Sequence, residues 1–191
     1  MLRIPYEAPQ GRRVNAIGAY FSHGPQAGTF AFETYASLPK NRAKKQRKPP
    51  EEVAAAHGLT LAEVGPIDRG RFLRFVGRIA GRPEIYAEDW KRAIPLYIVL
   101  DNYSVHKSDT VAEAIPLLEA ANVFLVYLPS YSPELSKIEP IWNGTKHHEM
   151  TVRSHSQVKD LKAAVDGALT RKAEALLAAQ QETTIELHRA A

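Results

Sequence analysis

Two short apolar runs constrain most strongly what this 191-residue chain can fold into. The first is PLYIVLD, residues 95–101, and the second is VFLVYLP, residues 123–129. Between them, SDTVAEAIPLLEAAN has a helical pattern that begins at the cap signals Ser108 and Asp109 and is kinked or interrupted at Pro116. Strand, helix and strand in this order are typical of parallel strands covered on both faces. The chain is therefore predicted to have an α/β fold.

The remaining elements are compatible with a mixed sheet flanked by helices. Residues 14–23 and 28–36 carry β-branched and aromatic side chains around the turn sequence HGPQAG, which predicts an antiparallel hairpin. Residues 69–80 repeat apolar side chains at three- and four-residue spacing among arginines, which predicts an amphipathic helix. Residues 156–179 predict one or two Ala/Leu-rich helices.

Composition excludes several classes of site. The chain has no cysteine, which excludes disulfides, thiolate zinc sites and cysteine nucleophiles. Its hydrophobic content of 45% is ordinary for a globular protein, and no apolar run approaches the ~20 residues that span a membrane. The N-terminus lacks the apolar core of a signal peptide, so a cytoplasmic location without membrane partners is expected.

A basic segment accounts for much of the net charge of +4. Such a run is either a solvated loop or a contact for the phosphate backbone of a nucleic acid, and charge alone does not decide between them. The candidate DNA-binding residues are Lys40, Arg42, Lys44, Lys45, Arg47 and Lys48.

Two carboxylates follow the apolar strands. Asp101 ends the first strand, and Glu139 lies near the start of the helix after the second. The carboxyl ends of parallel strands emerge on one side of a sheet, so these side chains can face each other and hold Mg²⁺. The alternatives are that Asp101 caps a helix, that Glu139 is a first-turn glutamate favoured by the helix dipole, and that His106 is a surface or capping residue.

The two segments LYIVLDNYSVH and VYLPSYSPELSKIEPIW together resemble the DDE-superfamily transposases, specifically the mariner-like branch carried by bacterial insertion sequences. The resemblance covers roughly residues 10 to 150. The residues that match the family pattern are Asp101, Asn102, His106, Leu128, Pro129, Tyr131, Ser132, Pro133, Leu135, Ile138, Glu139, Trp142 and, downstream, Lys146.

The resemblance implies an RNase H-like fold and a catalytic trio of two aspartates and one glutamate that binds two Mg²⁺ or Mn²⁺ ions. Asp101 would be the second aspartate and Glu139 the glutamate. One ion would activate water or a DNA 3′-hydroxyl, and the other would stabilise the leaving oxygen. The supporting motif residues would be Asn102, His106, Tyr131, Trp142 and Lys146.

The first aspartate of the family has no counterpart in this sequence. Its strand would lie upstream of Met1, and residues 1–13 contain no apolar strand that ends in Asp. We therefore expect an N-terminally truncated catalytic domain over residues 1–150, lacking its first strand, and a C-terminal helical extension over 151–191. Such a chain is expected to be catalytically impaired alone and to self-associate or to pair with an N-terminal half.

Three functions follow from these patterns. The first is a nucleoid-associated transposase domain that cleaves and transfers strands of transposon-end and target DNA with Mg²⁺ or Mn²⁺. The second is a non-catalytic remnant that binds DNA through the basic segment and the arginine-rich helix 69–82, or dimerises with a full-length enzyme. The third is an unrelated α/β enzyme that uses His106 or Asp101 as an acid–base group. Binding of a divalent metal separates the first from the others, and salt-dependent DNA binding separates the second from the third.

Overall fold

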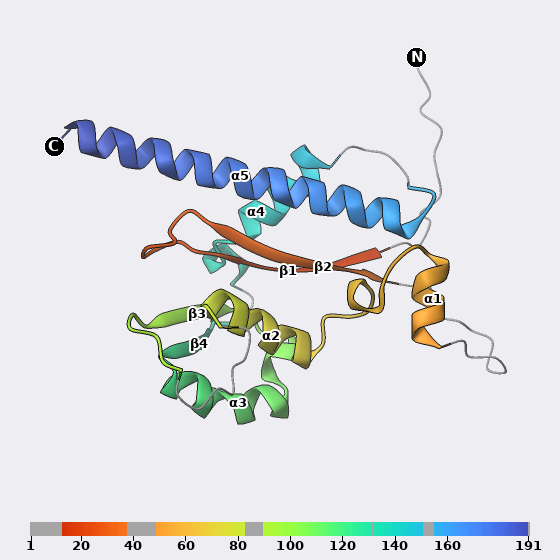
Figure 1. The fold of residues 1–191 in the computed structure, drawn as a ribbon. Coiled ribbons are helices and arrows are strands. Elements are labelled where there is room, and N and C mark those ends of the chain that lie inside the picture. Colours follow the sequence, from red (N-terminus) through yellow and green to blue (C-terminus); the bar gives the residue numbers. More distant parts are fainter. Residues whose placement is uncertain (1–12, 38–48, 83–89, 131, 151–154, 191) are drawn as a thin grey trace, which may run out of the picture.

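The computed structural model describes residues 13–37, 49–82, 90–130, 132–150 and 155–190. It is a mixed α/β structure in which helices flank two small sheets, which confirms the predicted class (Figure 1). The hairpin lies in the middle, between the C-terminal helix on one side and a strand–helix–strand unit on the other (Figure 1).

The predicted hairpin is present. Strand β1 (Arg13–Tyr20) pairs antiparallel with β2 (Phe30–Ser37), with Ile17 opposite Glu33. Gly24 and Gly28 in the turn both have φ +81°, a conformation that glycine adopts without steric cost. This explains why HGPQAG ends one strand and starts the next.

The predicted strand–helix–strand unit is also present. Strands β3 (Leu96–Leu100) and β4 (Val123–Tyr127) are parallel, and α3 (Asp109–Ala120) connects them. Helix α3 continues through Pro116 as one element. Both Pro116 and Ala112, four residues earlier, are exposed, so water can solvate the carbonyl that loses its partner there.

The two strand pairs form separate sheets, where one mixed sheet was expected. The prediction that the parallel strands are covered on both faces is wrong. On the open face Tyr97 is 64% exposed, Val99 56% and Val126 43%. Helix α3 and α2 (Arg69–Ala80) cover the other face, where Phe72 and Leu118 belong to the core around Leu100, Val111 and Val123. Helix α5 packs on the hairpin, and none of the described helices after β4 covers the open face (Figure 1).

Helix α2 has the amphipathic character expected from its sequence. The Asp68 carboxylate accepts the Arg71 N–H at 2.9 Å at its start, and Gly81 ends it with φ +96°. A short helix α1 (Pro50–Ala56) and a 3₁₀ turn η1 (Leu61–Glu63) precede it and pack on β2 through the small core that contains Ala36 and Ala54.

The C-terminal third covers the other side of the hairpin. It comprises α4 (Glu139–Gly144), the π-helical turn η4 (Thr145–Glu149) and a single helix α5 (Val158–Ala190). Ile141 and Leu169 pack with Phe30 in the core beneath α5. The 33 residues of α5 are sufficient in length for a membrane span, yet neither it nor any other helix of the described residues is apolar enough. The domain boundary at 150 and the absence of a first strand stay predictions.

Candidate functional site

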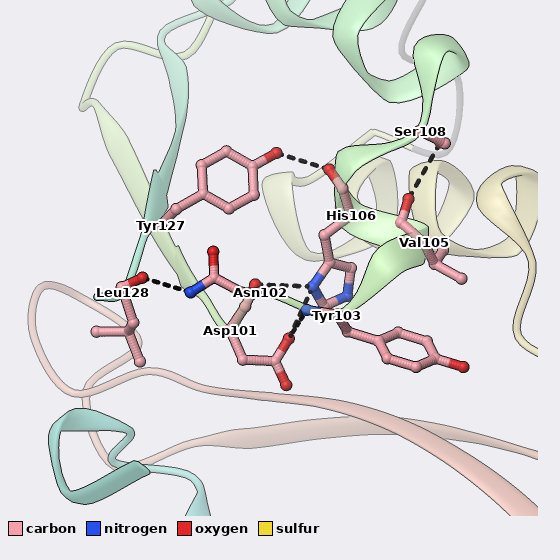
Figure 2. A network of polar contacts seen from close by, with 8 residues as sticks. All are labelled: Asp101, Asn102, Tyr103, Val105, His106, Ser108, Tyr127 and Leu128. Atoms are coloured by element: carbon pink, nitrogen blue, oxygen red, sulfur yellow. Dashed lines mark hydrogen bonds and ion pairs between the residues drawn. The ribbon is translucent and has the colours of Figure 1, made fainter. Parts of the chain in front are cut away.

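Asp101 directly follows the buried last residue of β3, and the local turn fixes one of its oxygens. Its Oδ1 accepts the Tyr103 N–H at 3.1 Å and lies 3.0 Å from His106 Nδ1 (Figure 2). The side chain is 66% exposed, and Oδ2 has no hydrogen-bond or ion-pair partner among the described residues. Asp101 therefore stabilises the turn that follows β3. It does not cap α3, because the N-cap residue of that helix is Ser108.

Asn102 joins the ends of the two parallel strands. Its Nδ2 donates to the Leu128 carbonyl at 2.7 Å, and the Leu128 N–H donates to the Leu100 carbonyl at 2.8 Å (Figure 2). The side-chain amide thus extends the ladder between β3 and β4 by one bond. This holds the turn that carries Asp101 against the end of β4.

His106 lies on the 3₁₀ turn η2 (Ser104–Lys107), and its side chain is only 15% exposed. Its ring centroid is 4.6 Å from that of Phe72 on α2, and Tyr103 meets it edge-on at 5.9 Å. Nδ1 also lies 3.3 Å from the Asp101 carbonyl. The imidazole is therefore packed against Phe72 and oriented toward Asp101.

Tyr127 completes this network, and the sequence analysis did not identify it. Its hydroxyl donates to the His106 carbonyl at 2.6 Å, which ties the last residue of β4 to η2 (Figure 2). Burial raises the pKa of Tyr127 above its usual value. A tyrosine at the end of an apolar strand is the only sequence signal, and it does not reveal a backbone carbonyl as the partner.

Glu139 is the first residue of α4 and lines a hollow of about 410 Å³. The first turn of a helix is a position where the helix dipole favours a carboxylate, as the alternative from the sequence held. The residues that line the hollow are Tyr20, Glu134, Ser136, Lys137, Glu139, Pro140 and Asn143.

The donor chemistry at Asp101 and Glu139 suits Mg²⁺ or Mn²⁺, because both side chains are carboxylates and that of Asp101 is 66% exposed. The described part of the chain gathers no group of three or more His, Asp or Glu side chains placed to hold a metal. Asp101 contacts Tyr103 and His106, and Glu139 lines the hollow with other residues. None of these contacts joins Asp101 to Glu139. The roles of the two residues as metal ligands therefore stay predictions.

Two of the other predicted residues lie on α4 and η4, and the rest lie outside the described residues. Trp142 on α4 meets Phe30 edge-on with ring centroids 5.5 Å apart, and Lys146 is exposed on η4. Tyr131 and the basic segment 40–48 lie outside the described residues. His147 and His148 are exposed on η4, whereas the Nε2 atom of His155 is buried and has no hydrogen-bond partner among the described residues.

Comparison with known proteins gives one match. The family model described as DDE superfamily endonuclease matches residues 54–162, which is more than half of the chain and includes both Asp101 and Glu139. No curated protein and no solved structure matches the chain. The mixed α/β arrangement is consistent with the RNase H-like fold that the resemblance implied. The chain belongs to the DDE superfamily endonuclease family.

Proposed function

We propose that this chain is the catalytic domain of a mariner-like transposase of bacterial insertion sequences, for metal-dependent DNA cleavage and strand transfer. The observation that carries the proposal is the position and hydrogen bonding of the Asp101 carboxylate. Its carboxylate stands at the carboxyl end of β3 with one oxygen held by the turn and the other without a partner among the described residues. It lies within the matched segment together with Glu139.

Asp101 and Glu139 are the proposed ligands of Mg²⁺ or Mn²⁺. When bound, the ions supply activation of water or a DNA 3′-hydroxyl and stabilisation of the leaving oxygen. Asn102 and His106 hold the Asp101 turn, and Trp142 fixes α4, which begins at Glu139. Tyr131 and Lys146 are further proposed motif residues. The basic segment 40–48 is the proposed contact for transposon-end and target DNA.

The chain is proposed to cleave DNA inefficiently alone, because the described residues gather no group of three metal-binding side chains that includes Asp101. The loss of one ligand weakens the binding of both metal ions when the two ions share that ligand. The partner that would supply it is a second copy or an N-terminal half of the enzyme. The two separate sheets support such pairing, since each of them presents strand edges.

A non-catalytic DNA-binding or dimerising role is the second candidate. It is favoured by exposed arginines on or beside α2, namely Arg69, Arg74 and Arg82. Nearby Arg71 and Arg78 are held instead by protein groups, including the Val64 carbonyl and the Glu33 carboxylate. The exposed side chains are available to phosphates, which any sequence of DNA offers.

Nicking of supercoiled plasmid by the purified chain with Mn²⁺ tests the proposed impairment, and the accompanying DNA binding tests both roles. We expect DNA binding that weakens steeply with salt, together with little nicking. Efficient nicking that is lost in Asp101→Ala and kept in the control Asp109→Ala, an exposed carboxylate at the start of α3, would overturn the proposed impairment. Failure to bind DNA even at low salt would contradict both the catalytic and the DNA-binding roles.

A further inference from the structure

The hydroxyl of Tyr127 forms a side-chain hydrogen bond from β4 to the turn that carries His106. It donates to the His106 carbonyl at 2.6 Å. The neighbouring carbonyl of η2 is held by Ser108, the N-cap residue of α3, whose Oγ donates to the Val105 carbonyl at 3.1 Å. The turn is therefore fixed on two sides (Figure 2).

The contact continues from the turn to the carboxylate. His106 Nδ1 lies 3.0 Å from Asp101 Oδ1 and 3.3 Å from the Asp101 carbonyl oxygen. The carbonyl oxygen can only accept a hydrogen bond, so Nδ1 carries the hydrogen in this geometry. The neutral imidazole is thus held as its Nδ1–H tautomer, while Nε2 has no hydrogen-bond partner among the described residues.

We propose that Tyr127 is a positioning residue for the metal-binding carboxylate of Asp101. By fixing the backbone of His106, it keeps Nδ1 within 3.0 Å of Oδ1 and thereby leaves Oδ2 for a divalent cation. The proposal rests on the proposed function, in which Asp101 is a ligand. Groups that orient a ligand in this way commonly affect metal affinity about 10–100-fold.

The ring of Tyr127 has a separate packing role, and the two can be distinguished. Tyr127 packs against the core of Leu100, Val123 and their neighbours, and the Lys107 ammonium lies 5.9 Å from its ring centroid. Tyr127→Phe keeps the ring and both of these contacts but removes the donor to His106. The matched control is Tyr97→Phe, because Tyr97 is 64% exposed on the neighbouring strand and its hydroxyl has no partner among the described residues.

Two measurements on the full chain test the proposal. The first is Mn²⁺ affinity by calorimetric titration of the wild type and both variants. The second is the tautomer of His106 from ¹⁵N NMR at about pH 9, where an ordinary histidine is neutral. A His106→Gln variant identifies the His106 signals among those of the seven histidines.

The expected result is an Nδ1–H tautomer in the wild type and in Tyr97→Phe, and a mixture of tautomers with about tenfold weaker Mn²⁺ binding in Tyr127→Phe. An unchanged tautomer in Tyr127→Phe would overturn the proposal. So would unchanged Mn²⁺ affinity in a variant that has lost the tautomer. A wild type that binds no Mn²⁺ would refute the proposed function, whereas the NMR comparison would still decide whether Tyr127 orients His106.

Discussion

The indole of Trp142 on α4 lies directly against the backbone of Gly18 in β1. A Cβ built on Gly18 would stand 2.9 Å from both Cη2 and Cζ2 of the indole, and 2.9 Å from Cε2 of Phe30. Only hydrogen fits at this position. Because α4 begins at Glu139, this contact sets how the Glu139 carboxylate stands relative to the hairpin.

Gly18→Ala is therefore expected to destabilise the protein. The added methyl group must displace two packed rings, and overpacking of this kind costs about 1–3 kcal/mol in the free energy of unfolding. Urea unfolding measures the loss. The control is Gly167→Ala on α5, where the Cβ would lie 3.4 Å from the flexible end of Arg171 and the better helix propensity adds up to about 1 kcal/mol. Equal stability of Gly18→Ala and wild type would contradict the packing described.

Gly24 and Gly28 provide a matched pair that tests whether α5 lies on the hairpin turn. Both have φ +81°, so alanine at either site incurs about 1–2 kcal/mol of backbone strain. A Cβ at Gly24 meets nothing within 4 Å, whereas at Gly28 it would stand 2.5 Å from Cβ of Gln180. Gly28→Ala should therefore cost about 1–3 kcal/mol more than Gly24→Ala. Equal losses in thermal or urea unfolding would show that α5 does not contact the turn in solution.

Tyr35 should make stability depend on alkaline pH. Burial, and then its hydrogen bond to Glu33, raise the pKa of Tyr35 to about 12. The unfolded phenol ionises near pH 10 and the folded one only near 12, so the unfolded state releases its proton first. The contribution of Tyr35 is complete below pH 10 and is lost as the pH rises from 10 to 12.

Unfolding of Tyr35→Phe over this pH range checks the effect, because other titrating groups are common to both proteins. The free energy of unfolding of Tyr35→Phe should fall less steeply with pH than that of the wild type. Tyr97→Phe, which removes an exposed hydroxyl, should keep the wild-type slope. Parallel curves for wild type and Tyr35→Phe would show that Tyr35 is not protected from ionisation.

Much of the fold could be predicted because its signals are local. The two apolar runs identify β3 and β4. The apolar residues at three- and four-residue spacing among arginines identify α2, and the predicted bounds 69–80 agree with those in the structure. Helix α5 extends past the predicted end at Ala179 because no Gly or Pro follows to stop it before residue 190. The division into two sheets could not be predicted, since strand pairing depends on contacts far apart in sequence.

The site was predictable to a similar degree. The end of an apolar strand predicts the location of Asp101, and the motif selects Asn102 and His106, which the structure brings together. Tyr127 could not be found, because its partner is a main-chain carbonyl in another element. The same limit applies to His155, whose buried Nε2 depends on packing that neighbouring residues do not encode.

Calorimetric titration with Mn²⁺ tests the central claim, that Asp101 and Glu139 hold a divalent metal. The titration compares the wild type with Asp101→Ala and Glu139→Ala, and Glu134→Ala serves as the control from the same hollow as Glu139. We predict that the wild type and Glu134→Ala bind Mn²⁺ and that both of the other variants lose binding. Binding that survives in either Asp101→Ala or Glu139→Ala, or no binding by the wild type, would contradict a site made by these two carboxylates.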